Sequence, residues 1–323
     1  MRKEYPQQFL QQILKRYPNK GQIKNYFLFT SGFENSNYYV KTEKEECVIK
    51  IFDGISMKKE NILFEIELMI FCSKNEVKTP KLFSTVEEKW YVEQEGKIAI
   101  VMEYIAAENC FKKTISDKVI EQVGEQAGKM DVLLKEFEGR IAPRKEYEWD
   151  MQHFLELEKA ILLLPKEFDR KLFHKIFEEF REIKPQFDAL PKTIIHNDIA
   201  AHNILADDSL RAIIDFSDTA VSCYVQNIAV FLCQTVFSYN WNQRQGRIFL
   251  EAYEKQNPLT NEVHALLYNL ICVRYGTIII EFNRWNTTYG EDPQRSEYIA
   301  DNYNFLKRFL AMGKETFERS IEK

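Results

Sequence analysis

Three residues in the C-terminal half of the chain have the types and spacing that phosphoryl transfer needs. Asp198 and Asp215 each follow a short apolar run, Ile194-Ile195 and Ala212–Ile214, so two brief strands would deliver both carboxylates to a common edge. Asn203 lies between them in the pattern H-x-D-x4-N, and an Asp-Phe pair follows. One carboxylate can orient or deprotonate an attacking hydroxyl, while an amide oxygen and a second carboxylate hold Mg²⁺ against nucleotide phosphates. The pattern indicates a kinase active site.

The surroundings of this motif favour that interpretation over the alternative, a polar loop between two strands that turns at Asp207-Asp208. An isoleucine pair precedes each aspartate and Ile-Leu follows Asn203. The order and spacing are similar to those of the catalytic loop and the metal-binding Asp-Phe of protein kinases.

The same stretch resembles the aminoglycoside phosphotransferase and choline kinase superfamily, whose loop usually reads H-G-D-x-x-x-x-N-I-L and then I-D-F or I-D-W. This resemblance implies a two-lobed, protein-kinase-like α+β fold, with a small antiparallel N-terminal sheet, one helix beside it and a mostly helical C-terminal lobe. It also implies that Asp198 is the catalytic base, that Asn203 and Asp215 are the Mg²⁺ ligands, and that His196 braces the loop. Asn197 stands where the family commonly has glycine or alanine.

Aromatic and β-branched runs predict strands at 26–30, 37–41 and 46–52. The loop between the first two falls where a nucleotide-covering loop would lie, and we expect its backbone N–H groups and the hydroxyls of Ser31 or Ser36 to contact phosphates. A plain connecting loop is the alternative. The run S-G-F-E-N-S-N-Y-Y-V resembles the corresponding segment of bacterial homoserine kinases of the superfamily, which favours an amino-alcohol kinase.

Lys50 is predicted to leave a half-buried strand, where an unpaired ammonium group is costly. Binding the nucleotide phosphates and pairing with a glutamate of the next helix would remove that cost; an ordinary solvent-facing lysine is the alternative. Glu65 and Glu67 flank the apolar stripe of that helix about equally. The superfamily spacing, counted back from Pro80, implies that Glu65 is the partner.

The apolar strand at 98–104 ends where the chain must cross into a second lobe. At such a crossover, backbone groups from Glu103 to Ile105 can pair with the edge of a purine. Backbone pairing does not distinguish ATP from GTP. We therefore predict a nucleotide-binding lobe at 1–105 and a helical lobe at 106–323 that carries catalysis and the acceptor site.

The composition limits the partners and the compartment. The net charge of −5 gives no general basic surface, so no nucleic-acid partner is expected. The six cysteines form no C-x-x-C pair and the start of the chain has no apolar signal segment, which predicts buried thiols, no zinc site and a cytoplasmic protein. Polar residues interrupt the apolar stretches 228–237 and 266–280, so we predict no membrane span; the interrupting residues are Gln234, Asn269 and Arg274.

The acceptor is the least determined part of the prediction. The run I-D-F-x-D after the catalytic loop resembles hydroxylysine-kinase-like members, so a hydroxyl on a homoserine- or hydroxylysine-like amino alcohol is the first choice. An aminoglycoside O-phosphotransferase, which would need an acidic pocket, is the second. A protein substrate fits less well because no A-P-E segment follows Asp215. A non-catalytic kinase-like binding or structural protein is the alternative from another class.

Two groups of residues stay open at this stage. Arginines of the last helices can clamp a carboxylate and Glu281 can meet an amine, although each is more often a packing or surface charge; the arginines are Arg244, Arg247, Arg274 and Arg284. Asp131 falls where superfamily members often carry histidine, and Asn227 replaces an aspartate at a supporting position.

Overall fold

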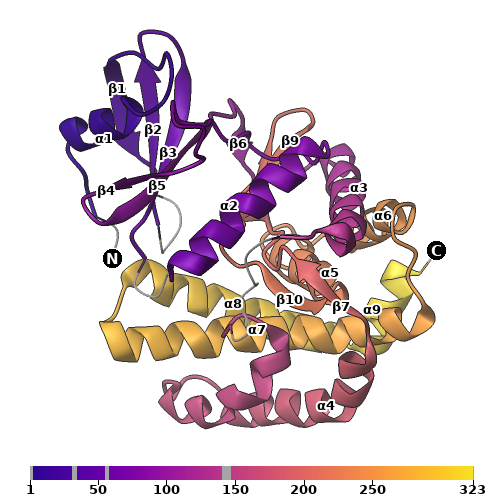
Figure 1. Ribbon diagram of the computed structural model, residues 1–323. Coiled ribbons are helices and arrows are strands. Elements are labelled where there is room, and N and C mark those ends of the chain that lie inside the picture. The colour runs from indigo at the N-terminus through magenta and orange to yellow at the C-terminus, as the bar shows by residue number, and fades with distance from the viewer. Residues whose placement is uncertain (1–2, 31–34, 55–57, 140–146, 323) are drawn as a thin grey trace. The chain divides into compact units, whose positions relative to one another are not determined.

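The computed structural model describes residues 3–30, 35–54, 58–139 and 147–322, which form two compact units (Figure 1). Unit 1 contains Met1–Ala107, Phe137–Ala142 and Arg211–Ser217, and unit 2 contains Glu108–Glu136, Pro143–Leu210 and Asp218–Lys323. The small antiparallel sheet of unit 1 and the mostly helical remainder confirm the predicted α+β class. The predicted division into domains after residue 105 stays a prediction, since unit 1 also takes two later segments.

Unit 1 is built on a five-stranded antiparallel sheet in the order β1-β2-β3-β5-β4. Its strands are β1 (Ile23–Leu28), β2 (Ser36–Thr42), β3 (Glu46–Phe52), β4 (Val92–Gln94) and β5 (Lys97–Glu103). Lys50 on β3 pairs with Asn37 of β2 and with Ile100 of β5. Because side chains alternate between the faces of a sheet, Lys50 and the buried Ile49 point to opposite sides.

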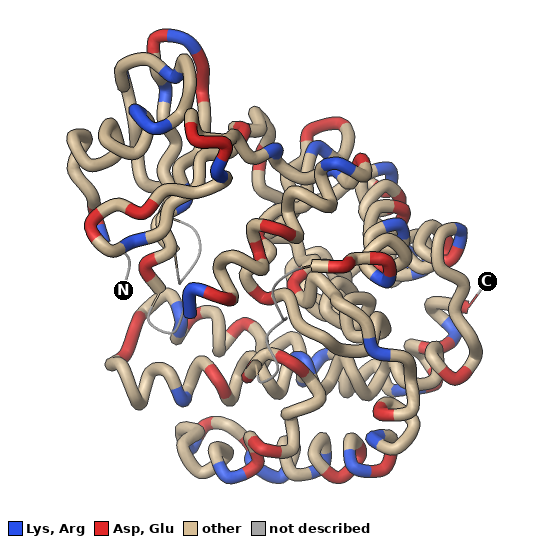
Figure 2. Tube along the Cα trace, viewed as in Figure 1, with Lys and Arg blue, Asp and Glu red and all other residues tan. Residues whose placement is uncertain are grey.

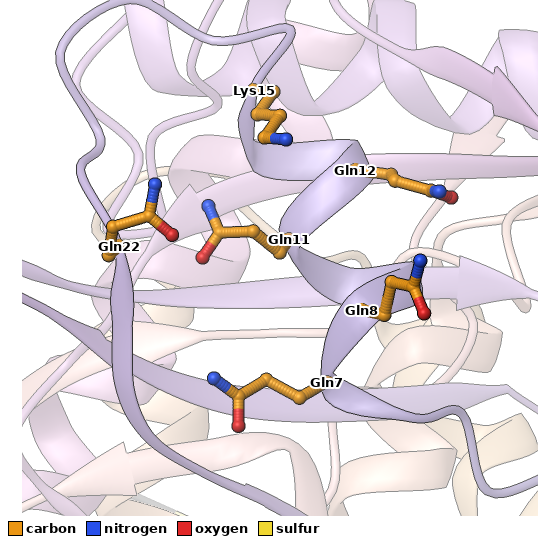
Figure 3. A pocket seen from close by; sticks show the side chains of 6 residues that line it. All are labelled: Gln7, Gln8, Gln11, Gln12, Lys15 and Gln22. Atoms are coloured by element: carbon orange, nitrogen blue, oxygen red, sulfur yellow. The ribbon is translucent and has the colours of Figure 1, made fainter.

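Helix α1 (Gln7–Leu14) packs on the Ile49 side of the sheet, so unit 1 carries a second helix besides α2 (Lys59–Lys74). A hollow of about 340 Å³ lies beside α1, lined by Gln7, Gln8, Gln11, Gln12, Lys15 and Gln22 (Figure 3). Gln11 donates to the Gly21 carbonyl at 3.1 Å and accepts from the Ile23 N–H at 2.8 Å. Gln11 therefore fastens α1 to the start of β1.

Unit 2 is mostly helical and also holds short strands on either side of Asp198 and Asn203. Strand β7 (Lys192–Ile195) pairs antiparallel with β10 (Ala220–Cys223), and β8 (Ile204–Ala206) pairs with β6 (Glu108–Asn109). Strand β9 (Leu210–Ile213) leads the chain from unit 2 into unit 1. The helices are α3 (Asp117–Leu133), a 3₁₀ helix (Met151–Leu163), α4 (Arg170–Ala189), α5 (Val225–Phe231), a π-helical turn (Leu232–Val236), α6 (Gln243–Glu254), α7 (Asn261–Tyr289), α8 (Pro293–Met312) and α9 (Lys314–Ile321).

Helices α3 and α6 approach each other closely at two glycines. A Cβ atom on Gly124 would lie 2.5 Å from the carbonyl oxygen of Phe249, and one on Gly128 would lie 2.6 Å from that of Tyr253. Such distances are shorter than side-chain carbons tolerate. Glycine is therefore required at both positions, and the close approach brings side chains of α6 within reach of α3.

Within the described residues, α7 is the one helix long and apolar enough to cross a membrane. We predicted from the sequence that no segment spans a membrane, but length and composition alone do not exclude α7. However, 83% of its most apolar 18-residue window is buried inside the structure. Burial among other helices explains the apolar sequence of α7. The cytoplasmic location stays a prediction.

Charged residues of both signs share the helical surfaces of unit 2. Figure 2 shows this on α4, where basic and acidic residues follow one another along the helix. The buried side of α4 is aromatic and aliphatic, with Phe173, Ile176, Phe177, Phe180 and Phe187 facing inward. The charges of α4 thus lie on the exposed side of an amphipathic helix.

Candidate active site

In unit 1, Lys50 lies at the centre of a buried polar cluster. Its Nζ is 2.7 Å from Oε1 of Glu65, 2.9 Å from Oδ1 of Asp215 and 3.0 Å from Oγ of Ser217. Ser217 Oγ also donates to Oε2 of Glu65 at 3.2 Å. The structure thus brings together three residues singled out from the sequence, and Glu65 is the glutamate that pairs with Lys50. Burial would lower the pKa of Lys50, but the two carboxylates outweigh it and raise that pKa.

Asp215 has an unusual backbone and an accessible side chain. Its φ is 66°, in the left-handed region that residues other than glycine rarely adopt, and its side chain is 42% exposed. Partial burial raises the pKa of Asp215, but the Lys50 ammonium and the Ser217 hydrogen bonds more than offset this and hold the pKa well below its usual range. The carboxylate therefore stays ionised, and part of it can meet a ligand.

The other predicted nucleotide contacts receive less support from the structure. Ser31 lies outside the described residues. Ser36 is fully buried, and its hydroxyl donates to Oδ2 of Asp53 at 2.8 Å. Because this hydroxyl is used to hold Asp53, we no longer assign Ser36 to phosphate binding. At the crossover, the Glu103 N–H donates to the Lys81 carbonyl and the Ile105 carbonyl accepts from Ala107, each at 2.8 Å. Purine binding by this segment stays a prediction.

In unit 2, Asp198 lies in a second polar cluster. Its Oδ2 accepts from Nδ2 of Asn203 at 2.7 Å and lies 2.8 Å from Nε2 of His202, while its Oδ1 accepts from Nη2 of Arg274 at 3.1 Å. A carboxylate offers about four acceptor positions. Among the donors that the described residues supply, three of these positions are used, which leaves one on Oδ1.

The charges around Asp198 decide its ionisation. Burial would raise the pKa of Asp198, but His202 and Arg274 together hold it below the ordinary value. In the same way burial lowers the pKa of His202, and the adjacent Asp198 raises it above the ordinary value. Asp198 is therefore a carboxylate that can accept a hydrogen bond from a hydroxyl group.

Arg274 reaches Asp198 from the middle of α7 and is itself firmly held. It is 3% exposed, its Nε and Nη2 donate to Oε1 of Gln234 at 3.1 and 2.9 Å, and its Cζ lies 5.7 Å from the centre of the Trp149 ring. Gln234 in turn donates to the hydroxyl of Tyr298 at 3.0 Å. A guanidinium fixed on this many sides holds Asp198 in one orientation.

The backbone of the loop after β7 explains the unusual residue beside Asp198. Asn197 has a φ of 66°, and asparagine tolerates this left-handed conformation better than most residues with a Cβ atom. The family's frequent glycine at this place has the same conformational freedom. On its other side, His196 is fully buried and its Nδ1 accepts from the Asp198 N–H at 3.3 Å. That contact agrees with the predicted brace.

The two predicted metal ligands have the right donor atoms for Mg²⁺. The amide nitrogen of Asn203 is used by Asp198, so the oxygen of that amide is the atom left for a cation. Asp215 offers an ionised, partly exposed carboxylate. Across the described parts of the chain, no group of three or more His, Cys, Asp or Glu side chains is placed to hold a metal ion. Asn203 belongs to unit 2 and Asp215 to unit 1, and the binding of Mg²⁺ by these two residues stays a prediction.

Three residues of these clusters were missed or left open by sequence reasoning. Ser217 follows the Asp-Phe pair directly and His202 precedes Asn203, so position next to a motif residue was the available signal. Arg274 was considered only as one of several arginines. Its distance of 76 residues from Asp198 along the chain gives no local pattern that would pair them.

Comparison with known proteins places these clusters in context. The sequence profile of the phosphotransferase enzyme family (APH) matches residues 28–266. Homoserine kinase of Methylobacillus flagellatus is 24% identical over 311 residues, which cover 93% of this chain and 91% of the relative. Hydroxylysine kinase of Xenopus laevis is 21% identical over 325 residues, covering 89% and 86%.

Solved structures of other proteins have a similar fold. An amicoumacin kinase in complex with AMP-PNP and Ca²⁺ superposes with a TM-score of 0.74 at 17% identity, covering 98% of this chain and 97% of that one. A microcompartment-associated aminopropanol kinase gives 0.65 at 12% identity, covering 98% and 99%. These likenesses confirm the predicted two-lobed, protein-kinase-like fold.

Proposed function

This chain belongs to the phosphotransferase enzyme family, and on that premise we propose that it transfers the γ-phosphoryl group of ATP to a hydroxyl of a small, amine-bearing molecule. Homoserine- and hydroxylysine-like amino alcohols are the first candidates, because kinases of those two compounds are similar to this chain over most of its length. A relative in fold holds AMP-PNP, which supports an adenine nucleotide, and GTP stays an alternative.

The proposal gives each cluster one task. Asp198 orients the acceptor hydroxyl and accepts its proton, using the position left on Oδ1. Lys50 binds nucleotide phosphates and is held for this by Glu65. Asn203 and Asp215 would hold Mg²⁺, which when bound with the nucleotide neutralises phosphate charge. Catalysis then comes mainly from positioning and charge stabilisation.

The single observation that carries the proposal is the state of Asp198. Its carboxylate is ionised, oriented by Arg274, His202 and Asn203, and has one acceptor position left among the described contacts. Three donors fix the orientation of this carboxylate, and it can still accept one more hydrogen bond. A hydroxyl group that donates this hydrogen bond is oriented for in-line attack and has a base for its proton. A chain serving only as a scaffold would have no need of this arrangement.

The charge next to Asp198 does not decide between the two candidate acceptors. Arg274 places a buried, permanent positive charge at the oxygen that would receive the hydroxyl. A polycationic aminoglycoside would bring further positive charge to that place, whereas an amino acid carries a carboxylate as well as an amine. The Asp198 carboxylate balances the charge of Arg274, so the order of the two candidates rests on the similar kinases of homoserine and hydroxylysine.

The experiment measures release of nucleoside diphosphate by the purified protein with Mg²⁺ and either ATP or GTP. The acceptor panel is homoserine, hydroxylysine, ethanolamine, choline and kanamycin, and a reaction without acceptor is the blank. Stimulation by one acceptor, lost in Asp198→Asn, supports the proposal. Nucleotide binding with no stimulation by any acceptor would favour the non-catalytic alternative, and stimulation by kanamycin alone would favour the aminoglycoside alternative.

A further inference from the structure

A buried carboxylate lies behind the catalytic loop of unit 2, at Asp131 on α3. Asp131 is completely buried, its Oδ1 accepts from Nδ2 of Asn227 at 2.6 Å, and its Oδ2 accepts from the hydroxyl of Tyr253 at 2.6 Å. Both of these donors are neutral. Burial raises the pKa of Asp131 to about 7, and the hydrogen bonds from Tyr253 and Asn227 counteract that rise.

Asn227 connects this carboxylate to the residue beside Asp198. Its Oδ1 accepts from the backbone N–H of Asn197 at 2.7 Å. Asn197 has the left-handed backbone that turns the chain into Asp198. The hydrogen bond from the Asn197 N–H therefore fixes the loop next to the carboxylate to which we assign catalysis.

An asparagine side chain can present either its oxygen or its nitrogen to a neighbour, and the two orientations have nearly the same shape. At Asn227 the choice matters, because a nitrogen facing the N–H of Asn197 would bring two donors together. In its ionised form the Asp131 carboxylate accepts hydrogen bonds only, so it then requires the nitrogen of Asn227 on its own side. The oxygen is thereby directed at Asn197.

We propose that Asp131 is a positioning residue, which fixes the orientation of the Asn227 amide so that its oxygen holds the Asn197 N–H and with it Asp198. The chain Asp131–Asn227–Asn197 is called the loop anchor below. The proposal rests on the proposed role of Asp198 in phosphoryl transfer.

An amide at position 131 does not replace the carboxylate. The hydroxyl of Tyr253 accepts from Nδ2 of Asn257 at 2.9 Å, so its own proton is free to be donated to Asp131. After Asp131→Asn, one of the two donors, Tyr253 or Asn227, faces an NH₂ group. Two facing donors cost about as much as a buried unsatisfied group, and rotation of the Asn227 amide is one way to relieve this.

Exchanging the carboxylate at position 131 and the amide at position 227 gives every donor and acceptor of the loop anchor a partner again. In the double variant Asp131→Asn with Asn227→Asp, the introduced amide accepts from Tyr253 and donates to the introduced carboxylate. The second oxygen of that carboxylate accepts from the Asn197 N–H. The double variant therefore distinguishes the loop anchor from a general need for a carboxylate at position 131.

The test compares wild type, both single variants and the double variant in two measurements. We expect Asp131→Asn to lower kcat between about tenfold and a hundredfold, with nucleotide affinity and acceptor KM within about twofold of wild type. We expect amide hydrogen exchange of Asn197 to become about tenfold faster, since a protecting hydrogen bond is lost. The double variant should recover both values to within about threefold.

One control addresses folding. Val123→Ala removes buried volume from the same helix at a residue that is not part of the loop anchor. It should lower the thermal midpoint and leave kcat nearly unchanged. Unchanged exchange of Asn197 in Asp131→Asn, or a double variant no better than its worse parent, would overturn the proposal. Exchange tests the loop anchor even if no acceptor supports turnover, in which case the proposed function alone has failed.

Discussion

Arg274 donates from Nη2 to Oδ1 of Asp198 at 3.1 Å, and both side chains are buried in unit 2. The pair joins the middle of α7 to the loop after β7, two segments that are far apart in sequence. A buried ion pair contributes little to stability relative to apolar residues of the same volume, because both charges lose hydration. Its retention next to the proposed catalytic carboxylate is better explained by orientation of Asp198 than by stability.

Asp198→Asn is expected to cut turnover by several orders of magnitude and to leave nucleotide affinity nearly intact. The amide keeps the shape of the side chain but cannot take up the proton of the hydroxyl. Acceptor-stimulated release of nucleoside diphosphate measures the first effect and calorimetric titration with nucleotide the second. Asp208→Asn, at an exposed turn, is the matched control. Near-normal turnover of Asp198→Asn would remove this residue from the mechanism.

Asp215→Ala is expected to weaken nucleotide binding in the presence of Mg²⁺ and to have a much smaller effect without it. The substitution removes one of the two proposed metal ligands and also one of the carboxylates beside Lys50. Titration of nucleotide with Mg²⁺ and with EDTA separates the two contributions. Equal affinities for wild type and variant in Mg²⁺ would contradict the assignment of Asp215 to the metal.

Features that depend on residues close together in the sequence were predicted better than contacts between residues far apart in the sequence. Alternation around Lys50 is local and placed this residue correctly on β3. The apolar runs before Asp198 and Asp215 correctly predicted the strands β7 and β9, but the expected common edge is wrong, because β7 pairs with β10 and β9 belongs to the sheet of β6 and β8. The Lys50–Glu65 pair needed the family spacing, because periodicity gave Glu67 an equal chance. Arg274 could not be paired with Asp198, since the contact depends on how α7 packs.

The same limit applies to the departures from the family pattern. Taken alone, Asp131 in place of histidine and Asn227 in place of aspartate had no explanation. The structure brings the two side chains within 2.6 Å, with the carboxylate of the contact at position 131. A linear pattern cannot reveal that these two positions are in contact. Ser36 shows the converse, because a hydroxyl in the expected loop position is used to bind Asp53.

Gly128→Ala is expected to destabilise the protein by roughly 1–3 kcal/mol or more, because the new methyl group would lie 2.6 Å from a backbone carbonyl oxygen of α6 that cannot move freely. Gly246→Ala is the matched control. Its nearest neighbours would lie at 3.5 Å, an ordinary contact distance, so it should be neutral or stabilising by up to about 1 kcal/mol through helix propensity. Urea unfolding measures both. Equal stabilities of the two variants would show that α3 and α6 do not pack as closely as described.

Glu281→Gln is expected to change how stability depends on pH. Glu281 on α7 is fully buried, and Arg284 contacts its Oε2 at 2.7 Å, while Oε1 has no hydrogen-bond partner within the described residues. Burial raises the pKa of Glu281 from 4.5 to about 7, and Arg284 offsets only part of that rise. The folded state therefore keeps a proton that the unfolded state has already released.

A raised pKa in the folded state gives a stabilising contribution that is complete below about pH 4.5 and is lost as the pH rises through about 7. Glu281→Gln cannot titrate, so this loss should disappear. Relative to wild type, the variant should gain on the order of 2 kcal/mol of unfolding free energy between about pH 5 and pH 8. Urea unfolding across that range measures the difference, and Glu262→Gln at an exposed position of the same helix is the control. Parallel pH curves for wild type and Glu281→Gln would mean that Glu281 is ionised throughout.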